Sequence, residues 1–276
     1  MPGDNQPTSR NKLGEKGRAA FAQMEYLARL ARNALKAGDI PRAIERLLGC
    51  IRMARGVRGA KERSRLFEAF AITDHLRVGY CHAALGPGHY GKALGHLNVV
   101  RRYLKWFRKN RHWELDKTQT GILCRALAEM ARICNLLGRH DRALLCADEC
   151  LDELYRGEVL QGGPAADLIQ MLGFAARGEA LRGLWHGGEV VVRHCEQVLL
   201  HYRKYVSVSG ASEDRKRLLR TGGDCIPWHR DRLHPENMLE QAEKALNEIR
   251  NGLSAPMRRL ADRILKEQQV WRESGE

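Results

Sequence analysis

The chain has 276 residues, of which 43% are hydrophobic and 29% are charged, a balance typical of a soluble globular or repeat protein with a sizeable core. It contains no run of about 18 apolar residues, so we expect no transmembrane helix. The formal net charge is +14 at pH 7. Residues 1–120 contain 24 Lys and Arg against 10 Asp and Glu, whereas residues 121–276 contain 23 of each. This asymmetry indicates a site for an acidic partner in the N-terminal half.

Residues 1–17 are polar and basic, and they contain no apolar stretch that could form the core of a signal peptide. We expect a disordered basic arm there. The eight cysteines are scattered through apolar helical patterns, and their spacing gives no disulfide framework. Buried, reduced thiols are the simplest interpretation, and they favour the cytoplasm, with the nucleus as the alternative.

Apolar residues recur at steps of three and four nearly from end to end, as in Phe21, Met24 and Ala28. This period is typical of amphipathic helices with one buried face. Clear alternating strands are absent from the sequence. The pattern therefore predicts an all-α fold of about ten helices.

Three glycines recur at intervals of 50 residues, each followed at a fixed distance by an alanine and then by a small or apolar residue. A glycine in the left-handed conformation can end one helix, and the alanine lets the next helix pack closely on it. A fourth, weaker copy has its turn at Gly187 and Gly188. The three aligned sets are Gly38, Gly88 and Gly138, then Ala43, Ala93 and Ala143, then Cys50, Val100 and Cys150.

On these positions the chain resembles the tetratricopeptide-like superfamily over roughly residues 18–207. The resemblance implies a right-handed array of four antiparallel helical hairpins, a TPR-like α-solenoid in which neighbouring hairpins share one core. The period of 50 exceeds the 34 residues usual for the family, and the closing proline is missing, so we expect longer helices or longer loops. The resemblance does not identify a ligand.

The C-terminal part breaks the repeat. Glycines and prolines in residues 208–234 predict a long loop. Residues 235–273 then predict a pair of helices, each with a proline in its first turn, at Pro235 and Pro256. We expect the last helix to cap the array.

The strongest candidate for a binding site is the basic segment of residues 101–113, on the second helix of the second hairpin. Its cations form a stripe beside the core face, and one tryptophan lies nearly opposite the core. Cations interleaved with aromatic side chains suit phosphate backbones and base stacking, while the alternative is a solvated face with the tryptophan packed on the next hairpin. Arginines of the first hairpin could extend this surface. The predicted binding residues are Arg101, Arg102, Lys105, Trp106, Arg108, Lys109, Arg111, Arg42 and Arg46.

Signatures of catalysis and metal binding are weak. The sequence contains no Walker loop and no recognisable order of Ser, His and Asp or of Cys and His, so we expect no enzyme active site. Cys146 and Cys150 lie one helical turn apart, but packing explains them better than zinc does. A second group, Cys225, His229 and His234, lacks an evident fourth ligand. We therefore predict no catalytic residue, no metal and no cofactor.

An acidic group lies on the helix that follows Gly138, and we expect it to be a solvated face that could also attract a neighbouring molecule. Its residues are Asp148, Glu149, Asp152, Glu153 and Glu158.

Two functions then remain open. The first is a non-enzymatic adaptor or scaffold that binds an acidic protein or peptide. The alternative is an RNA- or nucleic-acid-binding protein of the kind found in all-α viral nucleoproteins and matrix proteins. Self-association into a homo-oligomer is also open.

Overall fold

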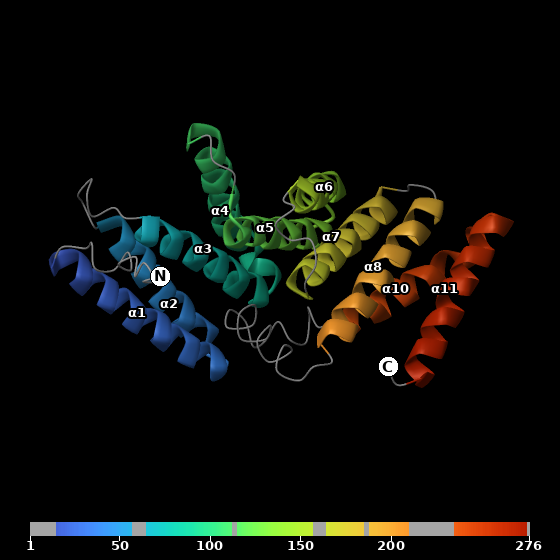
Figure 1. The fold of residues 1–276 in the computed structure, drawn as a ribbon, viewed down its shortest axis with the longest axis horizontal. Coiled ribbons are helices and arrows are strands. Elements are labelled where there is room, and N and C mark those ends of the chain that lie inside the picture. The colour runs from blue at the N-terminus through green and yellow to red at the C-terminus, as the bar shows by residue number, and fades with distance from the viewer. Residues whose placement is uncertain are drawn as a thin grey trace, which may run out of the picture. The chain divides into compact units, whose positions relative to one another are not determined.

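The computed structural model shows an all-α protein, as the sequence predicts (Figure 1). Its described residues form ten α-helices and two short 3-10 helices, and none of them forms a strand. No helix in this part of the chain is long and apolar enough to cross a membrane. The structure describes residues 15–56, 65–111, 115–156, 164–184, 188–209 and 235–274.

The helices follow one another closely in sequence. The first begins three residues before the predicted start of the repeats, and most of the predicted arm and of the predicted loop lies outside the described residues. In chain order the elements are α1 (Glu15–Lys36), α2 (Ile40–Gly56), α3 (Arg65–Ala84), η2 (Pro87–His89), α4 (Tyr90–Arg111), α5 (Lys117–Leu136), α6 (His140–Arg156), α7 (Pro164–Gly183), α8 (Gly188–Ser209), α10 (Pro235–Ile249), η4 (Arg250–Gly252) and α11 (Ala255–Ser274).

The turn between paired helices depends on a left-handed glycine, as the sequence predicts for Gly38 and Gly138, whose φ angles are 78° and 67°. The prediction is wrong for Gly88. In that hairpin Gly86 takes the left-handed conformation, with φ of 93°. The reason is local, because Pro87–His89 forms a 3-10 helix that contains Gly88 and moves the turn two residues earlier.

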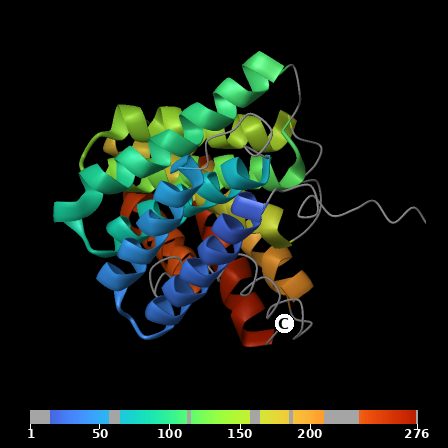
Figure 2. The same ribbon diagram turned by 90° about the vertical axis from the view of Figure 1, so that its left-hand side faces the viewer.

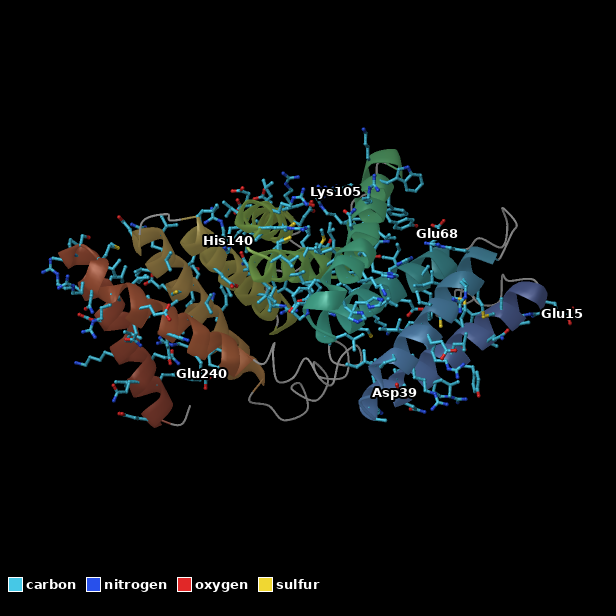
Figure 3. All side chains as sticks on the ribbon, turned by 180° about the vertical axis from the view of Figure 1, so that it is seen from behind. Glu15, Asp39, Glu68, Lys105, His140 and Glu240 are labelled. Carbon is cyan, nitrogen blue, oxygen red and sulfur yellow. The ribbon has the colours of Figure 1, made fainter. Side chains whose placement is uncertain are left out.

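The two correctly predicted turns have the same backbone hydrogen bonds. The N–H of Asp39 donates to the carbonyl of Ala34 at 2.9 Å, and the N–H of Arg139 donates to the carbonyl of Cys134 at 2.8 Å. These are the long hydrogen bonds of a Schellman motif, which satisfy carbonyls that the helix end leaves open. The carboxylate of Asp39, labelled in Figure 3, also accepts the N–H of Arg42 at 3.1 Å and so caps α2.

Equivalent packing contacts recur 100 residues apart. The thiol of Cys50 on α2 donates to the carbonyl of Met24 on α1, with 3.4 Å between sulfur and oxygen. The thiol of Cys150 on α6 donates to the carbonyl of Cys124 on α5 at 3.3 Å. Each contact joins the two helices of one hairpin, so the sequence repeat is also a repeat of structure. Ala43, Ala93, Ala143, Cys50, Val100 and Cys150 are all 0% exposed.

Two compact units divide the chain within α4, between Tyr103 and Leu104. In the first unit α1 packs on α2, and α2 packs on α3; Figures 1 and 2 both show α1 and α2 side by side. In the second unit α5 packs on α6, α6 on α7, and α7 on α8. The helices α10 and α11 both pack on α8.

The approach of α3 to α4 in the first unit depends on a glycine. A Cβ atom at Gly79 would lie 2.8 Å from the side chain of Leu97, which is fully buried and cannot easily move. We predict that Gly79→Ala lowers the free energy of unfolding by about 1–3 kcal/mol through overpacking. Gly95→Ala on α4 is the matched control, since no atom lies near its added methyl group, and it should raise stability by about 0.5–1 kcal/mol. Urea unfolding followed by circular dichroism measures both, and equal effects would contradict the packing argument.

Candidate partner-binding surface

The helix α4 carries most of the predicted binding residues, and its core face is the one that the sequence predicts. Leu97 and Val100 are fully buried, and Leu104 and Phe107 are nearly so. Their spacing of three and four residues fixes the rotation of the helix about its axis. The cations of the segment must therefore lie on its flanks and on its outer side.

The flank that bears Lys105 and Arg108 contacts α6 and not solvent alone. Arg108 donates to both carboxylate oxygens of Glu153, at 2.6 and 2.9 Å. Lys105, labelled in Figure 3, reaches from α4 to Glu149 of α6, with 2.8 Å between Nζ and Oε1. The hydrogen bond to Glu153 raises the pKa of Arg108, so this guanidinium stays charged. Two of the predicted binding cations therefore join helices of the second unit.

The prediction of a solvated acidic face on α6 is wrong for Glu153, which is only 6% exposed, and Glu149 is half-buried. A buried carboxylate needs a cation and hydrogen bonds to offset its desolvation, and the guanidinium of Arg108 provides both. Asp148 of the same helix pairs with Arg177 of α7. Charges of α6 thus connect it to α4 on one side and to α7 on the other.

The outer side of α4 remains accessible. Arg102, Trp106 and Lys109 lie at positions i, i+4 and i+7 and are all exposed, and the indole of Trp106 is 50% exposed. We call these three residues the outer stripe of α4. Half of the Trp106 side chain is therefore accessible and half is covered within the fold. Arg101 is half-buried beside the stripe, and the side chain of Arg111 lies outside the described residues.

The first hairpin carries a second set of exposed cations. Arg42 at the start of α2 is exposed, as predicted, whereas Arg46 is half-buried. On α1, Arg29 lies over the exposed ring of Tyr26, with 5.4 Å from its guanidinium carbon to the ring centroid. The sequence interpretation missed the α1 cations, although their spacings of eleven, three and four residues place them on one helix face. The exposed α1 cations are Arg18, Arg29, Arg32 and Lys36.

The exposed cations of both sets differ from Lys105 and Arg108 in one respect. Within the described chain, none of them forms an ion pair with a carboxylate. Their charge is therefore not neutralised locally, and it adds to the field of the N-terminal half. The members are Arg18, Arg29, Arg32 and Lys36 of α1, Arg42, Arg52 and Arg55 of α2, and Arg102 and Lys109 of α4.

The cysteines on α5 and α6 belong to the core. Cys134, Cys146 and Cys150 are buried and form no disulfide. Burial raises the pKa of Cys134, and the hydrogen bond with Cys124 together with burial raises the pKa of Cys150. Among the residues that the structure describes, no three His, Cys, Asp or Glu side chains are arranged to hold a metal ion. The other candidate group, Cys225, His229 and His234, lies outside those residues.

Known proteins give no further guide to this surface. Comparison of the sequence with protein-family models finds no match, and comparison with curated proteins finds none either.

The ion pair of Arg108 should matter more for stability than an exposed cation of the same helix does. Arg108→Ala leaves the buried carboxylate of Glu153 without its partner, and we predict a loss of about 2 kcal/mol in the free energy of unfolding. Arg102→Ala removes an exposed side chain of the same helix that forms no ion pair within the described chain, and it should change stability by less than about 0.5 kcal/mol. Chemical unfolding at pH 7 compares the two variants. A double variant, Arg108→Leu with Glu153→Leu, should recover most of the loss, and failure to recover would show that the pair is not its cause.

Proposed function

We propose that this protein is a non-enzymatic helical-repeat adaptor that binds an acidic protein or peptide segment through the exposed cations of its N-terminal half. The observation that carries the proposal is the division of cations into two classes. Lys105 and Arg108 neutralise carboxylates of α6, whereas the cations on the outer faces of α1, α2 and α4 have no carboxylate partner in the described chain. A surface of unneutralised cations attracts an acidic partner and fixes its orientation.

We further propose that the hairpins α1–α2, α3–α4, α5–α6 and α7–α8 form a right-handed, TPR-like array, with α10 and α11 as its cap. The recurrence of the Cys50–Met24 contact as Cys150–Cys124 supports a repeating unit. Arrays of this kind bind extended segments on accessible helix faces. The seven described cysteines are buried free thiols, which supports a cytoplasmic or nuclear location.

Binding of RNA is the second candidate function, and a specific observation favours it. Exposed aromatic rings lie among the exposed cations, with Trp106 between Arg102 and Lys109 on α4, and Tyr26 under Arg29 on α1. Such rings can stack on bases while the cations contact phosphates. We rank it second because an acidic segment needs only the exposed cations, whereas binding of single-stranded RNA also needs the rings to stack on bases.

Fluorescence anisotropy of two labelled probes, a 20-residue polyglutamate peptide and a 12-nucleotide oligouridylate, tests the proposal. We expect the full chain to bind the peptide, and we expect Arg102→Glu with Lys109→Glu to weaken binding by about tenfold or more, because each reversal replaces an attraction by a repulsion. Arg139→Glu with Arg142→Glu in the second unit is the matched control, since it makes the same change of charge at two exposed sites.

The outcomes separate the two functions. Equal losses in the α4 variant and in its control would refute a defined surface and leave only nonspecific attraction. Binding of the oligouridylate alone, with a steep dependence on salt and a loss in Trp106→Ala, would replace the adaptor by an RNA-binding protein.

A further inference from the structure

Four histidines stand at intervals of seven residues, and the fold of α3, η2 and α4 brings their rings together. His75 and His82 lie on one face of α3, because seven residues make about two helical turns. The Nδ1 atoms of His75 and His96 are 2.9 Å apart, and those of His82 and His89 are 3.4 Å apart. The rings of His82 and His96 stack with 5.8 Å between their centroids. The four rings therefore form one connected row within the first unit, which we call the histidine row.

The charges that face the histidine row are positive. The guanidinium of Arg55 on α2 lies 3.3 Å from Nε2 of His75, and the ammonium of Lys92 on α4 acts on His82. Among the contacts of the described chain, no carboxylate is hydrogen-bonded to a ring of the row. An imidazolium ion formed here would therefore meet cations and other imidazoles, with no anion to stabilise it.

The contact of His75 with His96 requires both rings to be neutral, because Arg55 donates to Nε2 of His75 and leaves its Nδ1 to donate to Nδ1 of His96. In a neutral imidazole one ring nitrogen donates a hydrogen bond and the other accepts one. A bond between two Nδ1 atoms, as in His75 and His96, needs a proton on one atom and a lone pair on the other. A second proton turns the acceptor into a donor, so the hydrogen bond is lost and two like charges lie side by side.

We propose that the histidine row is an acid-sensitive latch, which holds α3 against the start of α4 at neutral pH and releases them when its rings are protonated. This inference does not depend on the proposed function. His75 and His82 are 5% and 8% exposed, so the packed helices shield both rings from most of the solvent. Burial, with the neighbouring cationic or protonatable groups adding to it, lowers the pKa of both rings to about 4 and also lowers the pKa of His96.

The direction of the pH effect follows from these pKa values. Well above pH 6.5 the rings of His75 and His82 are neutral in both the closed and the open state, and their protonation does not affect the equilibrium. Between pH 6.5 and about 4 only the open state takes up the protons, so the closed state loses stability as the pH falls. Below about pH 4 both states are protonated and the loss is complete.

A buried carboxylate in the same unit acts in the opposite direction. Asp74 on α3 is fully buried, and burial raises its pKa to about 6, although Arg77, 3.0 Å away, lowers it. Between pH 6 and about 3.8 the closed state therefore takes up a proton at Asp74 that the open state does not, which stabilises the closed state as the pH falls. Acid still opens the latch, because proton uptake by two or more rings in the open state destabilises the closed state more than proton uptake by one carboxyl group stabilises it.

Hydrogen exchange read by mass spectrometry tests the latch in the full chain, with peptides from α3 compared at pH 7 and pH 5 after correction for the intrinsic rate. We expect the protection factor of α3 to fall on the order of 50-fold in the wild type, from the cited pKa values of His75, His82 and Asp74. His82→Phe keeps a ring of similar size without the titration, and it should reduce this fall to roughly twofold or threefold.

The second variant has the opposite effect. Asp74→Asn removes the opposing carboxyl group and should enlarge the fall to roughly 500-fold. His194→Phe on α8, whose ring also has a pKa lowered to about 4 by burial, is the control and should leave the exchange of α3 unchanged. Protection of α3 that does not depend on pH, or that falls equally in the wild type and in both His82→Phe and Asp74→Asn, would overturn the latch.

Discussion

The bidentate ion pair between Arg108 and Glu153 determines which cations of α4 are neutralised within the fold and which stay accessible to a partner. Because Glu153 is buried, its charge must be matched within the fold, and Arg108 on the adjacent flank of α4 provides the matching cation. This assigns one flank of the helix to folding. The outer stripe, Arg102, Trp106 and Lys109, is the exposed part of the helix that a partner could contact. If the proposed function is correct, one helix serves stability on one face and recognition on another.

The hairpins could be predicted from the sequence because their determinants are local. A left-handed glycine and an alanine five residues later act within a single turn, and Gly38, Ala43, Gly138 and Ala143 all take their predicted roles. The second hairpin departs from the pattern only where a proline changes the local geometry: Pro87 starts a 3-10 helix, and the left-handed residue is therefore Gly86. The error is two residues long and leaves Ala93 in its expected place.

The partners of individual side chains could not be predicted in the same way. The periodicity of α4 gives the face on which Arg108 lies, but its contact with Glu153 spans 45 residues and depends on how α6 lies against α4. The histidine row is an intermediate case. The interval of seven residues is visible in the sequence and places His75 and His82 on one face, whereas the contact of His75 with His96 arises only after the chain reverses at Gly86.

The positive charge of the first unit connects its two proposed properties. Unneutralised cations attract an acidic partner, and the same sign of charge near the histidine row opposes protonation of its rings. An acidic partner that binds only the closed unit would stabilise it by mass action, and its negative charge would also make a protonated ring less costly. Binding and the uptake of protons are then linked, and linkage is reciprocal. Acid that opens the latch weakens the binding of such a partner. The bound partner in turn makes opening of the latch less favourable by the same factor.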